Sequence, residues 1–190
     1  MKILKVLGVV GIALLAGCDT PVDPALVSAA PAAPQQFSAA KAAAAICGRN
    51  APNWSAAEAQ LVAAGYRETT SDWLPSVLPS TAAQKAGQIT ILEKPGTDVV
   101  VQFGTRAGEG ACLVGLKNMT PQQSYALALP WAQQFDAETN AERGNGLAKN
   151  AVQAWFASDD DGNTYIAAMK TWPLLDGPGA VARLMYYRKR

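Results

Sequence analysis

The sequence of 190 residues contains no histidine. This absence excludes Ser-His-Asp triads, Cys-His pairs and histidine metal ligands, because each of these sites requires an imidazole ring. A catalytic site would have to be assembled from carboxylates, hydroxyls or amines. The sequence shows no coherent set of such groups, so we expect no catalytic residues, no metal site and no cofactor.

An excess of charge of either sign is also missing. Lys and Arg number 16 and Asp and Glu number 15, which gives a formal net charge of +1. Nucleic-acid-binding domains carry a basic patch or stripe, and we therefore expect no nucleic-acid partner. The basic end at residues 188–190 could contact anionic headgroups, but a frayed, solvated terminus is the preferred interpretation.

The longest apolar run lies near the N-terminus. Lys2 and Lys5 precede an apolar stretch from Val6 to Leu15, a pattern typical of a secretory signal. A spanning helix is the weaker alternative, because it needs roughly 20 apolar residues. Removal of the leader takes two of the 16 basic residues and leaves 14 against 15 acidic ones, a formal net charge of −1.

The motif Leu15-Ala16-Gly17-Cys18 resembles the lipobox of bacterial lipoproteins. The resemblance covers only the leader. It implies that a signal peptide of residues 1–17 is removed, that Cys18 receives diacylglycerol and a further acyl chain such as palmitate, and that these lipids anchor the protein to a membrane. Asp19 resembles the inner-membrane retention signal of enteric lipoproteins, which implies the periplasmic face of the inner membrane. The outer membrane is the alternative.

Only two further cysteines, Cys47 and Cys112, are present. An even pair in an oxidising compartment predicts one disulfide. The bridge would close a loop of about 65 residues and contribute about 4 kcal/mol in the chain-entropy model. Two free, buried thiols are the alternative.

The remaining chain divides into a tether and one domain. Residues 18–37 are rich in Ala and Pro and predict an extended, semi-rigid tether, whereas residues 38–190 have the length of a single domain. The phrases AEAQLVAAGY and GACLVGLKN resemble small Ala-rich periplasmic proteins of unknown function. That resemblance implies no activity.

Two helices are predicted near the start of the domain. The Ala-rich segment from Ser38 to Cys47 predicts a short helix, with Gly48 as its C-terminal cap. Ser55 and Glu58 have the spacing of a capping box, in which each side chain accepts a hydrogen bond from the other residue's backbone. Gly65 is expected to end this second helix.

A third helix is predicted from Thr120, which is followed by Pro at the first helical position and Gln at the third. Leu127, Trp131 and Phe135 follow at four-residue spacing and are expected to share one face. Pro130 removes a backbone donor inside this run, so a kink or a break is expected there.

Strand patterns surround the third helix. Alternating apolar residues predict a hairpin over residues 88–103 and a next strand with Cys112, Val114 and Leu116 on one face. Three further strands are predicted at residues 148–157, 163–172 and 180–188. The order predicts an α+β fold with helices on one face of an antiparallel sheet, and it suggests two αβββ halves.

The Asp-rich segment 159–163 has some features of a calcium loop. If Asp159 is position one of such a loop, the required glycine position falls on Thr164 and the bidentate glutamate position on Lys170. The calcium-loop pattern therefore fails. A solvated hairpin turn is therefore the preferred interpretation, and a weak cation site is the alternative.

Two other patterns have equally simple interpretations. Ser38 and Lys41 match the S-x-x-K motif of penicillin-binding enzymes, but the accompanying S-D-N and K-T-G motifs are absent. We interpret Ser38 as a helix cap. Glu138 and Glu142 would share a helix face, where solvated carboxylates are the default interpretation.

Aromatic residues are the remaining binding candidates. The five tryptophans are mostly expected in the core. Trp73 is the exception, because it lies among prolines and polar residues in SDWLPSVLP. Since Trp is favoured at binding surfaces, we predict Trp73 as a binding residue on an exposed loop.

These observations favour a non-catalytic, membrane-tethered periplasmic domain that binds another envelope component, with an envelope protein as the expected partner. A carboxylate-based envelope hydrolase acting on glycans is the alternative. It requires an acid and a base carboxylate that converge in one pocket.

Overall fold

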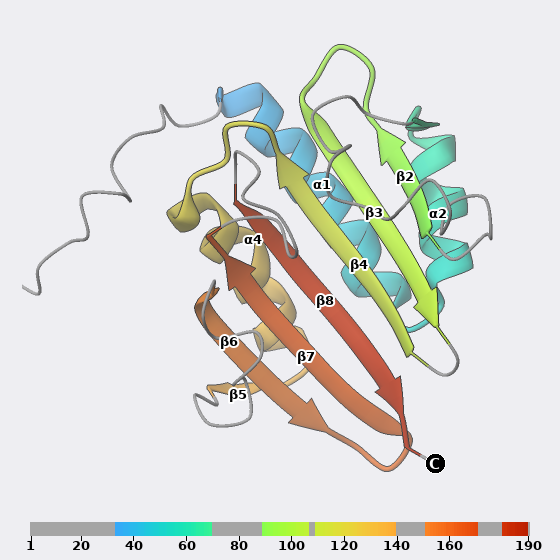
Figure 1. The fold of residues 1–190 in the computed structure, drawn as a ribbon, viewed down its shortest axis with the longest axis vertical. Coiled ribbons are helices and arrows are strands. Elements are labelled where there is room, and N and C mark those ends of the chain that lie inside the picture. Colours follow the sequence, from blue (N-terminus) through green and yellow to red (C-terminus); the bar gives the residue numbers. More distant parts are fainter. Residues whose placement is uncertain (1–32, 70–88, 107–108, 140–150, 171–179, 190) are drawn as a thin grey trace, which may run out of the picture.

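The computed structural model describes residues 33–69, 89–106, 109–139, 151–170 and 180–189. It confirms the α+β class, because the described helices lie on one face of an eight-stranded antiparallel sheet (Figure 1). The helices are α1 (Pro34–Asn50), α2 (Trp54–Ala63) and α4 (Pro121–Gln134). The strands are β1 (Arg67–Glu68), β2 (Ile89–Glu93), β3 (Val99–Arg106), β4 (Glu109–Leu116), β5 (Glu138–Thr139), β6 (Ala151–Ser158), β7 (Gly162–Met169) and β8 (Val181–Arg188).

The strand order of the sheet is β1-β2-β3-β4-β8-β7-β6-β5. From the centre outward, the first four strands and the last four strands each run in reverse chain order. Strands β4 and β8 pair at its centre, where Cys112 lies opposite Leu184. Helix α1 comes first, and each half then contains one helix, α2 or α4, followed by a two-residue strand and three longer strands. The predicted αβββ halves therefore each gain one short strand.

The helix ends of the two halves also correspond. Gly65 after α2 has φ +87° and Asp136 after α4 has φ +49°. At both ends the backbone N–H of the following residue returns to the last turn, from Tyr66 to the carbonyl of Leu61 and from Ala137 to that of Ala132. These are left-handed helix caps, and they direct the chain into β1 and β5.

Helix α1 is longer than the sequence predicts. It begins at Pro34, because proline suits the first helical position. The alanine-rich segment that follows has a high helix propensity. The predicted helix start at Ser38 is therefore wrong by four residues, and residues 34–37 belong to the helix. Gly48 is not the predicted cap, since the helix continues through it to Asn50. Ser38 lies within the helix and does not cap it.

The other two helices differ in how well their starts were predicted. Asn53, rather than Ser55, caps α2, because its side-chain oxygen accepts the backbone N–H of Ala56 at 3.2 Å. Thr120 caps α4 in the predicted capping box. Helix α4 continues past Pro130 to Gln134, so the break allowed for at Pro130 does not occur.

The predicted hairpin is confirmed by the pairing of β2 with β3. The three C-terminal strands are also present, with ends shifted by up to a few residues within the described ranges. Glu138 is exposed in β5 and does not belong to a helix, so it does not share a helix face with Glu142. Residue 142 itself lies outside the described residues.

The predicted disulfide between Cys47 and Cys112 is present, with the two Cα atoms 6.3 Å apart. It joins α1 to the central strand β4. The side chains of Cys112, Val114 and Leu116 are buried against the helices, as predicted. Of the tryptophans in the described ranges, Trp54, Trp131 and Trp155 are all buried in this core.

Tyr66 gives the core a measurable pH dependence. Its hydroxyl donates a hydrogen bond to the carbonyl of Ala39 at 3.3 Å, and burial raises the pKa of Tyr66 to about 12 from 10.0. The folded state therefore holds the phenol proton more tightly than the unfolded state does. This contribution is complete below about pH 10 and is lost as the pH rises towards about 12.

We expect the difference in unfolding free energy between the wild type and Tyr66→Phe to decrease between about pH 10 and pH 12. Urea unfolding of both proteins at each pH measures this difference. Lysines titrate in the same pH interval, but they are present in both proteins, so their contribution cancels in the difference. A difference that stays constant across the interval would contradict the assignment.

Candidate functional site

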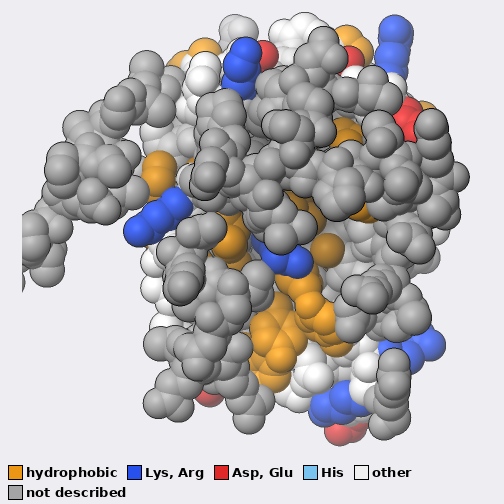
Figure 2. Space-filling model, viewed as in Figure 1, with side chains coloured by type: hydrophobic (Ala, Val, Ile, Leu, Met, Phe, Trp, Pro, Cys, Tyr) orange, Lys and Arg blue, Asp and Glu red, His pale blue; other side chains and the backbone are white. Residues whose placement is uncertain are grey.

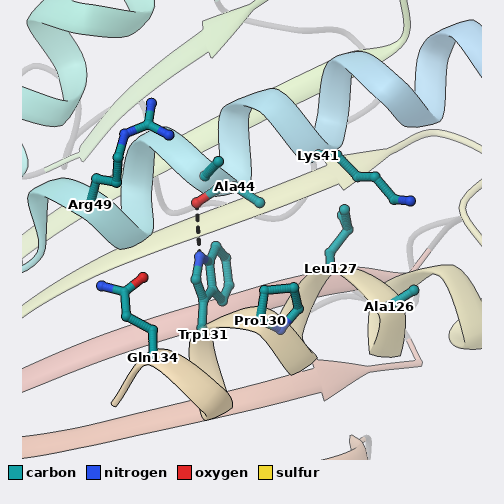
Figure 3. Close-up of a pocket in the computed structure, with 9 residues that line it drawn as sticks. Lys41, Ala44, Arg49, Ala126, Leu127, Pro130, Trp131 and Gln134 are labelled. Atoms are coloured by element: carbon teal, nitrogen blue, oxygen red, sulfur yellow. Dashed lines mark hydrogen bonds between the residues drawn. The ribbon is translucent and has the colours of Figure 1, made fainter.

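A groove with a volume of about 330 Å³ lies between α1 and α4, on the helical side of the molecule (Figure 3). Its floor is apolar and its only charged side chains are two cations from α1. Trp131 and Leu127 are buried beneath it, whereas most of the remaining lining side chains are exposed. The lining residues are Lys41, Ala44, Ala45, Arg49, Ala126, Leu127, Pro130, Trp131 and Gln134.

Two side chains of α4 fix its position against α1. The indole Nε1 of Trp131 donates a hydrogen bond to the carbonyl of Ala44 at 2.8 Å. The amide Nε2 of Gln134 donates to the carbonyl of Gly48, also at 2.8 Å. Both acceptors belong to the backbone of α1, so the two hydrogen bonds fix the distance between α1 and α4, the two walls of the groove.

Gly48 allows the two helices to approach this closely. A Cβ atom at residue 48 would lie 2.7 Å from Cδ1 of Trp131 and 2.9 Å from Oε1 of Gln134. The indole is buried, so it has little room to move. A glycine inside a helix is therefore retained here, where its propensity alone disfavours it by about 1 kcal/mol.

We expect Gly48→Ala to lower the free energy of unfolding by about 2 kcal/mol, because an overpacking cost of about 3 kcal/mol outweighs a gain of about 1 kcal/mol in helix propensity. Urea unfolding measures the change. Gly104→Ala is the matched control, since a Cβ atom there would meet nothing within 4 Å. Equal stabilities for the two variants would show that α4 is not held against Gly48.

The two cations lie at opposite ends of the groove. Lys41 and Arg49 are eight residues apart in α1, which corresponds to about 12 Å along the helix axis. Figure 3 shows the two side chains at different ends of the cavity. No carboxylate is among the lining residues. The Nζ atom of Lys41 lies 4.9 Å from the ring centre of Phe37, a cation–π contact.

Pro130 interrupts the hydrogen-bond pattern of α4 beside the groove. Proline has no N–H, so the helical hydrogen bond that the carbonyl of Ala126 would accept from residue 130 cannot form. Both residues line the groove. The site therefore combines an apolar floor and two separated cations. This combination suits binding of an anionic, apolar partner better than it suits bond cleavage.

None of the predicted site residues within the described ranges lines this groove. Cys18 and Trp73 lie outside the described residues. Cys47 and Cys112 form the disulfide. Asp159 accepts hydrogen bonds from the backbone N–H groups of residues 161 and 162, which confirms the hairpin turn.

Sequence reasoning missed the groove itself. Lys41, Ala45 and Arg49 recur at four-residue spacing, which places them on one face of a helix. That signal was present in the sequence, but the predicted helix stopped at Cys47 and so excluded Arg49. The partner wall on α4 is distant in sequence, and no local pattern indicates that the two segments meet.

The opposite face of the sheet has an apolar centre, and the cation Arg183 lies among its central strands. Figure 2 shows apolar side chains in the middle of this face. Arg183 lies on this face, directly across from Leu113 and Ala167. Its Nε atom is buried and has no hydrogen-bond partner among the described residues. Burial lowers the pKa of its guanidinium, and the neighbouring Tyr187 opposes that shift. The described apolar residues of this cluster are Ile91, Val100, Leu113, Ala167, Met169 and Val181.

Comparisons with known proteins add no function to this geometry: no family model, no curated protein and no solved structure matches the chain. Within the described ranges, no group of three or more cysteine or carboxylate side chains is placed to hold a metal ion. None of the described helices is long and apolar enough to cross a membrane. The site must therefore be interpreted from its own chemistry.

Proposed function

We propose that the protein is a lipid-anchored periplasmic lipoprotein that acts as a non-catalytic binding or accessory module for another envelope component. The proposed anchor is Cys18 and the proposed membrane is the inner one. The observation that carries the proposal is the α1–α4 groove, which presents an apolar floor between two cations. Clefts of this size, lined mostly by apolar side chains with a few polar groups, are typical of binding sites.

A carboxylate-based hydrolase receives less support. Such an enzyme needs an acid and a base that face one substrate, and the groove contains neither. Among the candidate carboxylates in the described ranges, Asp159 is engaged in its own turn. Glu138 is exposed on the edge strand β5. No observation on these residues favours catalysis.

Site-specific crosslinking in intact cells tests the proposal. A photoreactive amino acid replaces Ala45, which is exposed and lines the groove. The matched control places the same amino acid at Ser55, which is exposed on α2 and outside the groove. Crosslinked products are then identified by mass spectrometry.

We expect one envelope protein to be crosslinked from residue 45 and not from residue 55. The product should disappear in the Cys18→Ala variant, because this protein would lack its lipid anchor. If residues 45 and 55 give the same products, the groove is not the binding site. If purified protein instead cleaves envelope glycans and loses this activity on replacement of one carboxylate, the hydrolase alternative is correct.

A further inference from the structure

We infer that the α1–α4 groove binds an acidic amphipathic helix of a partner protein, with two carboxylates seven or eight residues apart. The inference rests on the proposed binding function and specifies the chemistry of the partner. Its basis is the position of the charges relative to the apolar floor.

The separation of the two cations favours a helix over a lipid. Lys41 and Arg49 are about 12 Å apart along the axis of α1, and residues seven or eight positions apart on a second helix are separated by about 10 to 12 Å. A fatty acid or a single phospholipid headgroup concentrates its negative charge at one end. It would reach one cation and leave the other unmatched, whereas a helix carrying two acids would match both.

The described surroundings leave both cations available for this pairing. Lys41 and Arg49 are exposed, and no acidic side chain lines the groove with them. The cation–π contact with Phe37 holds the Lys41 ammonium near the end of the groove. Complementary charges at the two ends would set the register and direction of a bound helix.

The floor between the cations suits the apolar face of a helix. Ala45, Ala126 and the ring of Pro130 are exposed lining residues, and such small side chains allow a second backbone to approach closely. Leucine-sized side chains three and four residues after the first acid would enter above the buried Trp131.

Peptide binding to the purified full chain tests this inference. The probe is a fluorescein-labelled, Ala-based helical peptide with Glu at positions i and i+7 and Leu at i+3 and i+4. A second peptide carries Lys in place of both Glu residues. Fluorescence anisotropy measures the binding of both peptides to three proteins: the wild type, the groove variant Lys41→Glu/Arg49→Glu, and the control variant Arg67→Glu/Lys117→Glu. The last variant makes the same change in net charge at exposed positions outside the groove.

We expect the acidic peptide to bind the wild type and the Arg67→Glu/Lys117→Glu control within about twofold of each other, and the groove variant about tenfold or more weakly. The Lys peptide should bind only the groove variant. Equal losses in both double variants, or no binding of the acidic peptide, would overturn the inference.

Two further outcomes separate the inference from its alternatives. If phosphatidylglycerol vesicles bind through Lys41 and Arg49 while the acidic peptide does not, the groove binds a membrane surface and the inference is wrong. If the cellular crosslink from residue 45 persists after reversal of both charges, the binding function holds but the acidic-helix inference fails. Loss of the crosslink on charge reversal supports both.

Discussion

Replacement of both Cys47 and Cys112 by alanine is expected to lower the free energy of unfolding by about 4 kcal/mol. The bridge spans 65 residues of sequence, and opening so long a loop restores much conformational freedom to the unfolded chain. The total stability of a domain is only about 5–15 kcal/mol. Loss of the bridge would therefore remove a large part of it.

Urea unfolding of the oxidised protein and of the double alanine variant measures this effect. Cys18 is replaced by alanine in both proteins, so that no free thiol complicates the comparison. Reduction of the oxidised protein should produce a similar loss, because it opens the same loop without changing the sequence. Coincident unfolding midpoints for all three samples would show that the bridge does not stabilise the fold.

Replacement of Trp131 by alanine is expected to cost about 4 kcal/mol. The indole is 2 % exposed and packs between α4, α1 and the sheet. Its loss removes a large apolar surface and the hydrogen bond to the carbonyl of Ala44. The same change removes the floor of the groove, so peptide binding should fall together with stability.

Trp131→Phe separates the contribution of packing from that of the hydrogen bond. Phenylalanine keeps an aromatic ring in the core but has no N–H donor, so we expect a loss smaller than that of the alanine variant. Urea unfolding and acidic-peptide binding are measured on both variants. If the two substitutions destabilise the protein equally, the hydrogen bond, and not the packed ring, holds α4 against α1.

Local chemistry explains which helix boundaries were predictable. The start of α4 followed from Thr120 and Gln123, because the cap and its partner lie three residues apart. The starts of α1 and α2 were not predicted correctly, because several residues in each segment can cap or initiate a helix. Pro34 and Asn53 provide the actual starts, and only the folded arrangement selects them over Ser38 and Ser55.

The sheet and the site depend on longer-range information. The long strands were predicted from alternating apolar residues, but β1 and β5 contain two residues each and are too short to form a pattern. The groove was not predictable, because Trp131 meets Ala44 across 87 positions of sequence. Gly48 could be read from sequence only as a cap, since its close contact with Trp131 belongs to the tertiary structure.

The two shortest strands have a consequence for molecules held at high density on one surface. β1 and β5 form the outer edges of the sheet, and their described side chains are exposed and include Arg67, Glu68 and Glu138. At β1 and β5 themselves a neighbouring strand would find only two residues to pair with, and the charged side chains there disfavour edge-to-edge pairing. On the membrane surface proposed above, these two strands would therefore offer neighbouring copies little backbone to pair with.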